Sequence, residues 1–145
     1  MMSPKWWDAT LTIYNKYEDP DTNLVSWYKA IVNNCFWKYQ GDKVVIGQTI
    51  LESNTTICRI GKSDNFVEKH VWNQLEDKSS KFTLAIGDII IKGSVDDEVD
   101  EYTPGKRSTD LLNKYKENQG CIIVNSISLN DGIARNNKHY LVRGS

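Results

Sequence analysis

Two histidines and three cysteines are the side chains in this sequence with the strongest acid–base or nucleophilic potential. His139 lies in a strand-like pattern beside Tyr140 and Leu141, where a structural histidine is far commoner than a general base. His70 is the other imidazole. The three cysteines are Cys35, Cys58 and Cys121.

Each cysteine lies in an apolar or β-branched stretch, and the spacing is wide, which indicates reduced core thiols rather than zinc ligands or a disulfide framework. The motifs of nucleotide, acyl-transfer, zinc-protease and CxxC redox sites do not occur in the sequence. We therefore expect a protein that is not an enzyme and that uses no cofactor and no metal.

An acidic run holds five carboxylates within residues 96–101: Asp96, Asp97, Glu98, Asp100 and Glu101. Carboxylates at this density cannot be buried together, so residues 95–107 are expected to form an exposed acidic loop. The run lacks the alternating oxygen ligands, the turn glycine and the bidentate glutamate of a calcium loop.

Large aromatic side chains are more numerous than alternate-face packing in one small domain easily buries: Trp6, Trp27, Tyr28, Phe36, Trp37, Tyr39 and Trp72. Aromatics left over from a core are typical anchors of protein interfaces, and the alternative is that they fill a roomy barrel core. The candidate interface residues are Trp6, Trp27, Phe66 and Trp72. The alternation of the first strand predicts that Trp7 faces the core together with Leu11 and Ile13. Trp6 is predicted to face outward, on the same side as Thr12 and Tyr14.

The elements that must position these residues are mainly strands. Alternating or apolar runs bounded by turn residues predict strands at 9–14, 24–39, 41–53, 55–60, 82–86, 89–91, 121–129 and 138–144. Asn33 and Asn34 predict a bulge or bend in the second of these strands. Residues 61–81 form a long excursion, with room for a short helical turn.

A short helix is predicted at 108–119, where Ser108 or Thr109 caps the start, Asp110 suits the first turn and Gly120 follows the end. About eight short strands with one inserted helix and long loops indicate a mainly β fold, a small antiparallel β-barrel or sandwich. Residues 1–145 are expected to form a single domain.

Charge and hydropathy argue against a nucleic-acid-binding protein, a membrane protein and a secreted protein. The formal net charge is −1, which is unlike a protein that binds nucleic acid tightly by neutralising phosphates. No apolar run is long enough for a membrane span, and the N-terminus does not resemble a secretory signal, so we expect no membrane association.

Four stretches in this order resemble a family of small virion proteins: LTIYNKYEDPDTNLVSWYKAIVNNCFW, TTICRI, FTLAIGDIIIKG and KHYLVRG. The family comprises phage and prophage proteins of Gram-positive bacteria that are labelled minor capsid or head-to-tail connector proteins. Gly61 departs from the pattern, because a proline is expected after Arg59 and Ile60, and the glycine frees the backbone there.

The resemblance implies a non-enzymatic head-completion, or stopper, protein that forms a ring, closes the filled head and connects the portal and adaptor to the tail. The implied partners are copies of itself, the portal or adaptor protein and tail-end proteins, with packaged DNA met only in the channel. The implied location is the virion, and the host cytoplasm during assembly. The acidic loop would then face the channel and repel DNA.

Two alternatives stay open. A small barrel of this kind also suits a minor capsid, decoration or tail-end structural protein. From a different class, an OB-like barrel would bind single-stranded nucleic acid or oligosaccharide, using aromatic rings as stacking platforms.

Overall fold

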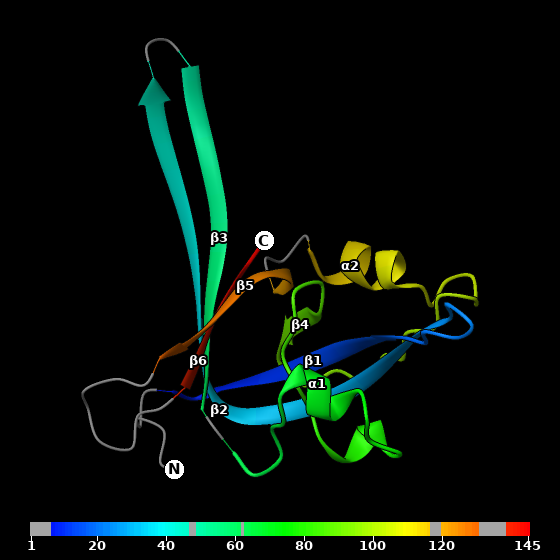
Figure 1. The fold of residues 1–145 in the computed structure, drawn as a ribbon. Helices are drawn as coiled ribbons and strands as arrows, with labels where there is room; N and C mark the ends of the chain where they lie inside the picture. Colours follow the sequence, from blue (N-terminus) through cyan, green and yellow to red (C-terminus); the bar gives the residue numbers. More distant parts are fainter. Residues whose placement is uncertain (1–6, 47–48, 62, 117–119, 131–138) are drawn as a thin grey trace.

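The structure is a computed structural model that describes residues 7–46, 49–61, 63–116, 120–130 and 139–145. Six strands close a β-barrel in the order β1-β2-β3-β6-β5-β4, and every neighbouring pair is antiparallel. The strands are β1 (Ala9–Glu18), β2 (Val25–Ile46), β3 (Thr49–Gly61), β4 (Ile89–Lys92), β5 (Cys121–Asn130) and β6 (His139–Gly144). The helices are α1 (Lys69–Trp72), the 3-10 turn η1 (Lys78–Ser80) and α2 (Ser108–Lys116) (Figure 1).

The mainly β, antiparallel barrel confirms the expected fold class, but the strand count of about eight was too high. Residues 41–46 continue β2, and 49–55 continue β3, so the separate strands expected at 41–53 and 55–60 are parts of one hairpin. Residues 82–86 form no strand and make only an isolated bridge, Phe66 to Phe82. The expected helix end at 119 lies outside the described residues.

A bulge bends β2 at Asn33 and Asn34, as the sequence predicted. Ala9 pairs with Cys35 while Leu11 pairs with Val32, so two residues of β2 oppose Thr10. Asn34 takes a left-handed conformation with φ of 58°, which asparagine tolerates better than most residues. Before the bend β2 pairs with β1, and after it β2 pairs with β3.

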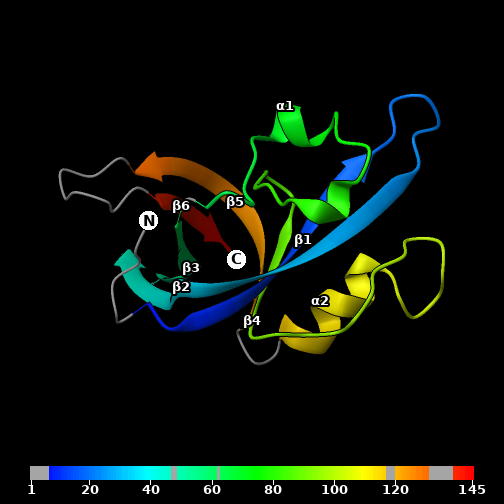
Figure 2. The ribbon, with the colours of Figure 1, turned by 90° about the horizontal axis from the view of Figure 1, so that it is seen from below.

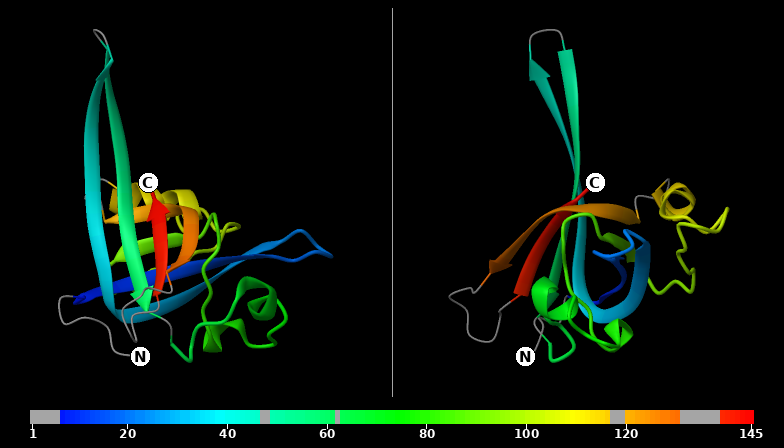
Figure 3. Two further views of the ribbon diagram at one scale, coloured as in Figure 1. Left: turned by 60° about the vertical axis from the view of Figure 1, so that its left-hand side comes forward. Right: turned by 45° about the vertical axis from the view of Figure 1, so that its right-hand side comes forward.

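The β2–β3 hairpin leaves the barrel as a two-stranded ribbon (Figures 1 and 3). β1 stops pairing with β2 at Cys35, and β6 stops pairing with β3 at Thr56. Residues 40–46 and 49–55, which we call the arm, therefore pair with each other, and neither edge of the arm pairs with another of the described strands.

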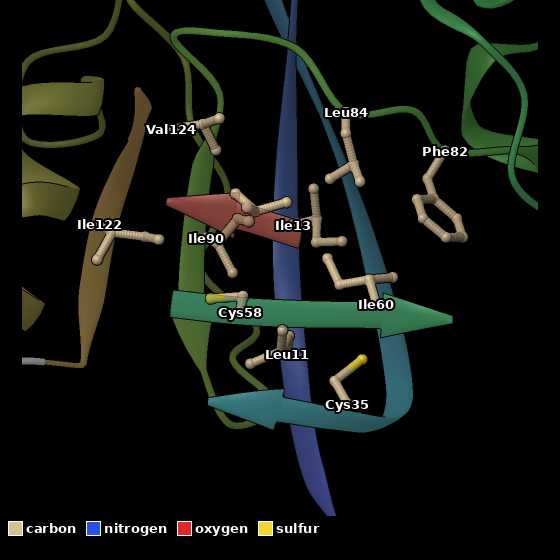
Figure 4. Close-up of a cluster of buried hydrophobic side chains, with 11 residues drawn as sticks. Leu11, Ile13, Cys35, Cys58, Ile60, Phe82, Leu84, Ile90, Ile122 and Val124 are labelled. Carbon is tan, nitrogen blue, oxygen red and sulfur yellow. The ribbon is translucent and has the colours of Figure 1, made fainter. Parts of the chain in front are cut away.

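Two hydrophobic clusters lie on the two sides of β1. The first fills the barrel (Figure 4): Leu11, Ile13, Cys35, Cys58, Ile60, Phe82, Leu84, Ile90, Ile122, Val124 and Val142. The second lies between the outside of the barrel and α2: Tyr14, Ile89, Ile91, Leu111 and Cys121.

The expected outward face of β1 is therefore not exposed, because Thr12 and Tyr14 are buried under residues 93–99 and α2. Trp7 is buried as predicted, 2% exposed, and its ring stands edge-on to His139 with centroids 5.1 Å apart. Trp6 lies outside the described residues.

A buried polar network ties the stretch before β4 to β1. The Asp88 carboxylate accepts hydrogen bonds from Asn15 Nδ2 at 2.9 Å, Lys16 N at 3.0 Å and Ala85 N at 3.0 Å. Asn15 also donates to Thr83 O at 2.6 Å and accepts from Thr83 N at 3.1 Å. Burial raises the pKa of Asp88, and these donors act in the opposite direction.

Replacing Asp88 by asparagine is expected to destabilise the fold by about 2 kcal/mol, because an amide NH₂ would face N–H donors in a buried site. Urea denaturation of Asp88→Asn measures the loss. Asp64→Asn is the matched control, since Asp64 is exposed, and it is expected to change stability by less than about 0.5 kcal/mol. Equal effects of the two variants would contradict the role of Asp88.

Gly144 is expected to be required for close packing of β6 on β5. A Cβ at this position would clash with the carbonyl oxygen of Ile123 and lie 2.9 Å from Ile122 Cδ1. Gly144→Ala should therefore cost about 1–3 kcal/mol, measured by thermal or urea unfolding. Gly120→Ala is the control, because its Cβ would meet nothing within 4 Å. A Gly144→Ala variant as stable as the control would show that β5 and β6 separate easily.

Candidate functional site

Trp72 is a core residue, which corrects its expected role as an interface anchor. Its side chain is 0% exposed, and its Nε1 donates to Lys78 O at 3.2 Å. Tyr17 and Tyr28 pack edge-on against its ring, with centroid distances of 6.1 and 5.6 Å. The irregular spacing of apolar residues in 61–81 concealed this role, because α1 and η1 are too short to show a period.

Trp27 and Phe66 are half-buried and lie in different clusters. Trp27 packs against the second cluster, and Lys16 Nζ lies 5.9 Å from the centroid of its ring. Phe66 packs against Phe82 and Tyr140, with ring centroids 5.5 and 4.4 Å away. The structure thus does not bring the described candidates Trp27, Phe66 and Trp72 together into one aromatic patch.

Lysine side chains cover some of the aromatic faces. Lys69 Nζ lies 4.5 Å from the centroid of Trp72, and Lys78 Nζ lies 4.3 Å from that of Tyr17. A stacking platform for bases needs open ring faces beside the cations. In the described part of the chain, these two lysines lie over these two rings, so the contacts are made within the protein. They give no support to the alternative that the protein binds single-stranded nucleic acid.

Asp97, in the middle of the acidic run, binds α2. Its carboxylate accepts from Lys114 Nζ and from Tyr115 Oη, each at 2.8 Å, and its backbone carbonyl accepts from Tyr14 Oη at 2.6 Å. The hydrogen bonds from Lys114 and Tyr115 lower the pKa of Asp97. This residue fastens the run to the helix and to β1.

Asp100 and Glu101 also serve local structure. Asp100 accepts from Tyr102 N at 3.0 Å and from Thr103 Oγ1 at 2.8 Å, which forms a turn. Glu101 Oε1 accepts from Ser108 N at 2.7 Å, at the start of α2. Three of the five carboxylates of the run thus make contacts within the chain.

Asp96 and Glu98 point away from the molecule. From residue 93 to residue 100 half-buried and exposed residues alternate, a pattern typical of an extended chain. Val95 and Val99 pack on the second cluster, whereas Asp96 and Glu98 are exposed and have no hydrogen bond or ion pair with the described residues. We call residues 95–101 the acidic segment.

A groove of about 560 Å³ follows the edge of β2 that is not paired with β1. Lys29, Ile31 and Asn33 are on the β2 wall, and Asn65 and Lys81 are on the wall formed by the inserted segment. Ile31 is 45% exposed, although it belongs to a strand. No local pattern predicts this groove, because its walls are about 30 or more residues apart in the chain.

Ile86 is the most exposed large hydrophobic side chain of the described residues, at 73%. The expected strand placed it inward with Phe82 and Leu84, which are buried as predicted. Instead Gly87, with φ of 97°, turns the chain so that Asp88 N donates to Ala85 O at 3.1 Å. The Gly87–Asp88 pair was the signal for this turn.

The described residues hold little reactive chemistry. Burial raises the pKa of the Cys35 thiol to about 12 and raises that of Cys58 as well, so neither is a nucleophile near neutral pH. Among these residues no group of three or more His, Cys, Asp or Glu side chains is placed to hold a metal ion. The helices found in the same ranges are too short or too polar to span a bilayer.

Comparison with curated proteins and with solved structures finds no match. A family model does match, over residues 6–145, which is nearly the whole chain and includes every strand of the barrel. That family is described as a family of unknown function. The chain therefore belongs to the family DUF6751.

Proposed function

We propose that this protein is a non-enzymatic structural protein of a bacteriophage virion. In this proposal it assembles as a ring at the head-to-tail junction, closes the filled head and connects the portal or adaptor protein to the tail. Its partners are other copies of itself and the proteins above and below the ring. The packaged DNA is met only in the channel.

The arm is the observation that carries the proposal. An isolated two-stranded ribbon is at best marginally stable in water, and exposed strand edges pair readily with other chains. The arm is a ribbon of this kind that projects away from the barrel. Its outer half contains the apolar cross-strand pairs Val44–Leu51 and Val45–Ile50. A projecting ribbon of this kind suits a protein whose native state includes neighbours.

The resemblance of four sequence stretches to connector proteins supports the specific location. The alternative locations are a minor capsid, decoration or tail-end position, since a small barrel with an arm serves any of them. Each location makes a different particle when the protein is missing, so particle morphology separates them.

Deleting the gene from the phage or prophage that encodes it is expected to yield heads that package DNA, lack tails and lose their DNA. Electron microscopy and nuclease protection of the packaged DNA measure this outcome. Tailed particles with fragile heads would favour a decoration role, and filled heads with defective tails would favour a tail-end role. Particles of normal shape, infectivity and composition would contradict a virion role.

Shortening the arm is expected to prevent assembly into particles while leaving the folding of the barrel nearly unchanged. Gly41 and Asn54 are a cross-strand pair, so an Asn-Gly turn can replace residues 42–53 without altering the pairing of β1 or β6. We expect the unfolding midpoint to shift by less than about 4 °C, equivalent to about 1 kcal/mol. Incorporation into particles, measured by immunoblotting, should be lost.

The control for this experiment is Glu76→Ala, a change at an exposed residue that leaves the arm intact. It is expected to enter particles at the wild-type level. Incorporation of the shortened protein at that same level would show that the arm is dispensable and would remove the main support for the proposal.

A further inference from the structure

The free edge of β2 is a place where a strand can be added. β1 covers one edge of β2 up to Cys35, and β3 covers the other edge only from Phe36 onward. Residues 29–31 make no backbone hydrogen bond outside the β1 ladder within the described part of the chain. An extended peptide can hydrogen-bond to such an edge, in the mode called β-augmentation.

The groove along this edge is basic. Its lining includes Lys29 and Lys81 and no carboxylate among the described residues. Lys81 Nζ donates to the backbone carbonyl of Asp64 at 2.9 Å, which leaves its charge without an anionic partner there. Asn65 adds an amide to the wall, and the Ser79 and Ser80 hydroxyls, which also line it, donate to Asp77. Charge and shape together favour an extended, acidic occupant.

The chain itself carries a segment with these properties. The acidic segment has the alternating burial of an extended chain, and its outward residues, Asp96 and Glu98, have exposed carboxylates. Neither residue makes a backbone hydrogen bond within the described ranges. Within one copy, however, the segment lies over Thr12 and Tyr14 of β1, and none of its residues lines the groove.

We propose that the acidic segment of one copy docks along the free edge of β2 in the next copy, with Asp96 and Glu98 facing Lys29 and Lys81. The two surfaces lie at different places on each copy, so the contact is heterologous and repeats from copy to copy. The inference rests on the proposed ring and names the surfaces that build it. It also assigns these two carboxylates to a subunit contact rather than to a channel wall.

Charge reversal tests the contact. One variant carries Lys29→Glu and Lys81→Glu, and the other carries Asp96→Lys and Glu98→Lys. Each alone should associate on the order of tenfold more weakly than wild type, because two attractive pairs become repulsive. An equimolar mixture should recover association, and so should a single chain that carries all four changes. Sedimentation velocity and incorporation into particles measure both effects.

A control reverses charges at exposed positions that neither line the groove nor belong to the acidic segment, with Glu18→Lys and Asp21→Lys in one chain. This variant should associate like wild type. Loss of association that the mixture and the fourfold variant do not restore would overturn the proposed contact, as would wild-type association of the two reversed variants.

Cysteine cross-linking gives a direct test of proximity between copies. The native cysteines are buried, so Ile31→Cys in one chain and Glu98→Cys in another provide accessible thiols. Mild oxidation of the mixture should yield a covalent heterodimer, and a chain with both changes should yield a ladder. Leu129→Cys replaces Ile31→Cys in the control, since both side chains are 45% exposed, and it should yield neither product.

The outcomes separate this inference from the proposed function. Particles that need the arm but tolerate charge reversal, and show no Ile31–Glu98 cross-link, would overturn the contact and leave the virion role standing. A heterodimer and a charge-dependent association from a protein absent from virions would support the contact and remove the role. Copies that never associate, in solution or in particles, would overturn both.

Discussion

The bend in β2 is the constraint on which the architecture depends. A single strand of 22 residues serves two neighbours in succession, and the change occurs at Asn33 and Asn34. β1 pairs with one edge of β2 up to Cys35, and β3 pairs with the other edge from Phe36 onward, so each neighbour takes one half of the strand and six strands close the barrel. The bend sends the second half of β2 out of the barrel with β3. It also leaves the first half with an edge that none of the described strands covers.

β1 lies at the centre of the molecule, with apolar residues packed on both of its faces. Leu11 and Ile13 face the barrel interior (Figure 4). Tyr14 belongs to the second cluster, together with Leu111 of α2. Figure 2 shows α1 and α2 on opposite sides of the β1–β2 hairpin, so each face of this hairpin has its own cover. The acidic segment belongs to one of these covers, and Asp97 holds it in place.

Local patterns in the sequence were enough to predict β1, the bend, the last two strands and the helix after the acidic run. The alternation of 9–14 identified the strand but placed Thr12 and Tyr14 outside, because their cover comes from residues more than 80 positions later. Asn54 looked like a turn, yet it pairs with Gly41 inside a ribbon, where cross-strand hydrogen bonds override local preference. Trp72 was read as surplus because its partners Tyr17 and Tyr28 come from strands far away in sequence.

The arm also bears on how the protein resists aggregation. Its outer half has a sequence that combines strong β propensity with apolar residues, a composition that favours amyloid-like stacking when edges are open. Charged residues stand immediately inside this apolar stretch, since Lys43 pairs with Glu52 and Asp42 pairs with Ser53. Such flanking charges act as gatekeepers, because stacking identical arms in register would place like charges against one another. The ribbon can therefore keep its edges unpaired while resisting indiscriminate aggregation during synthesis.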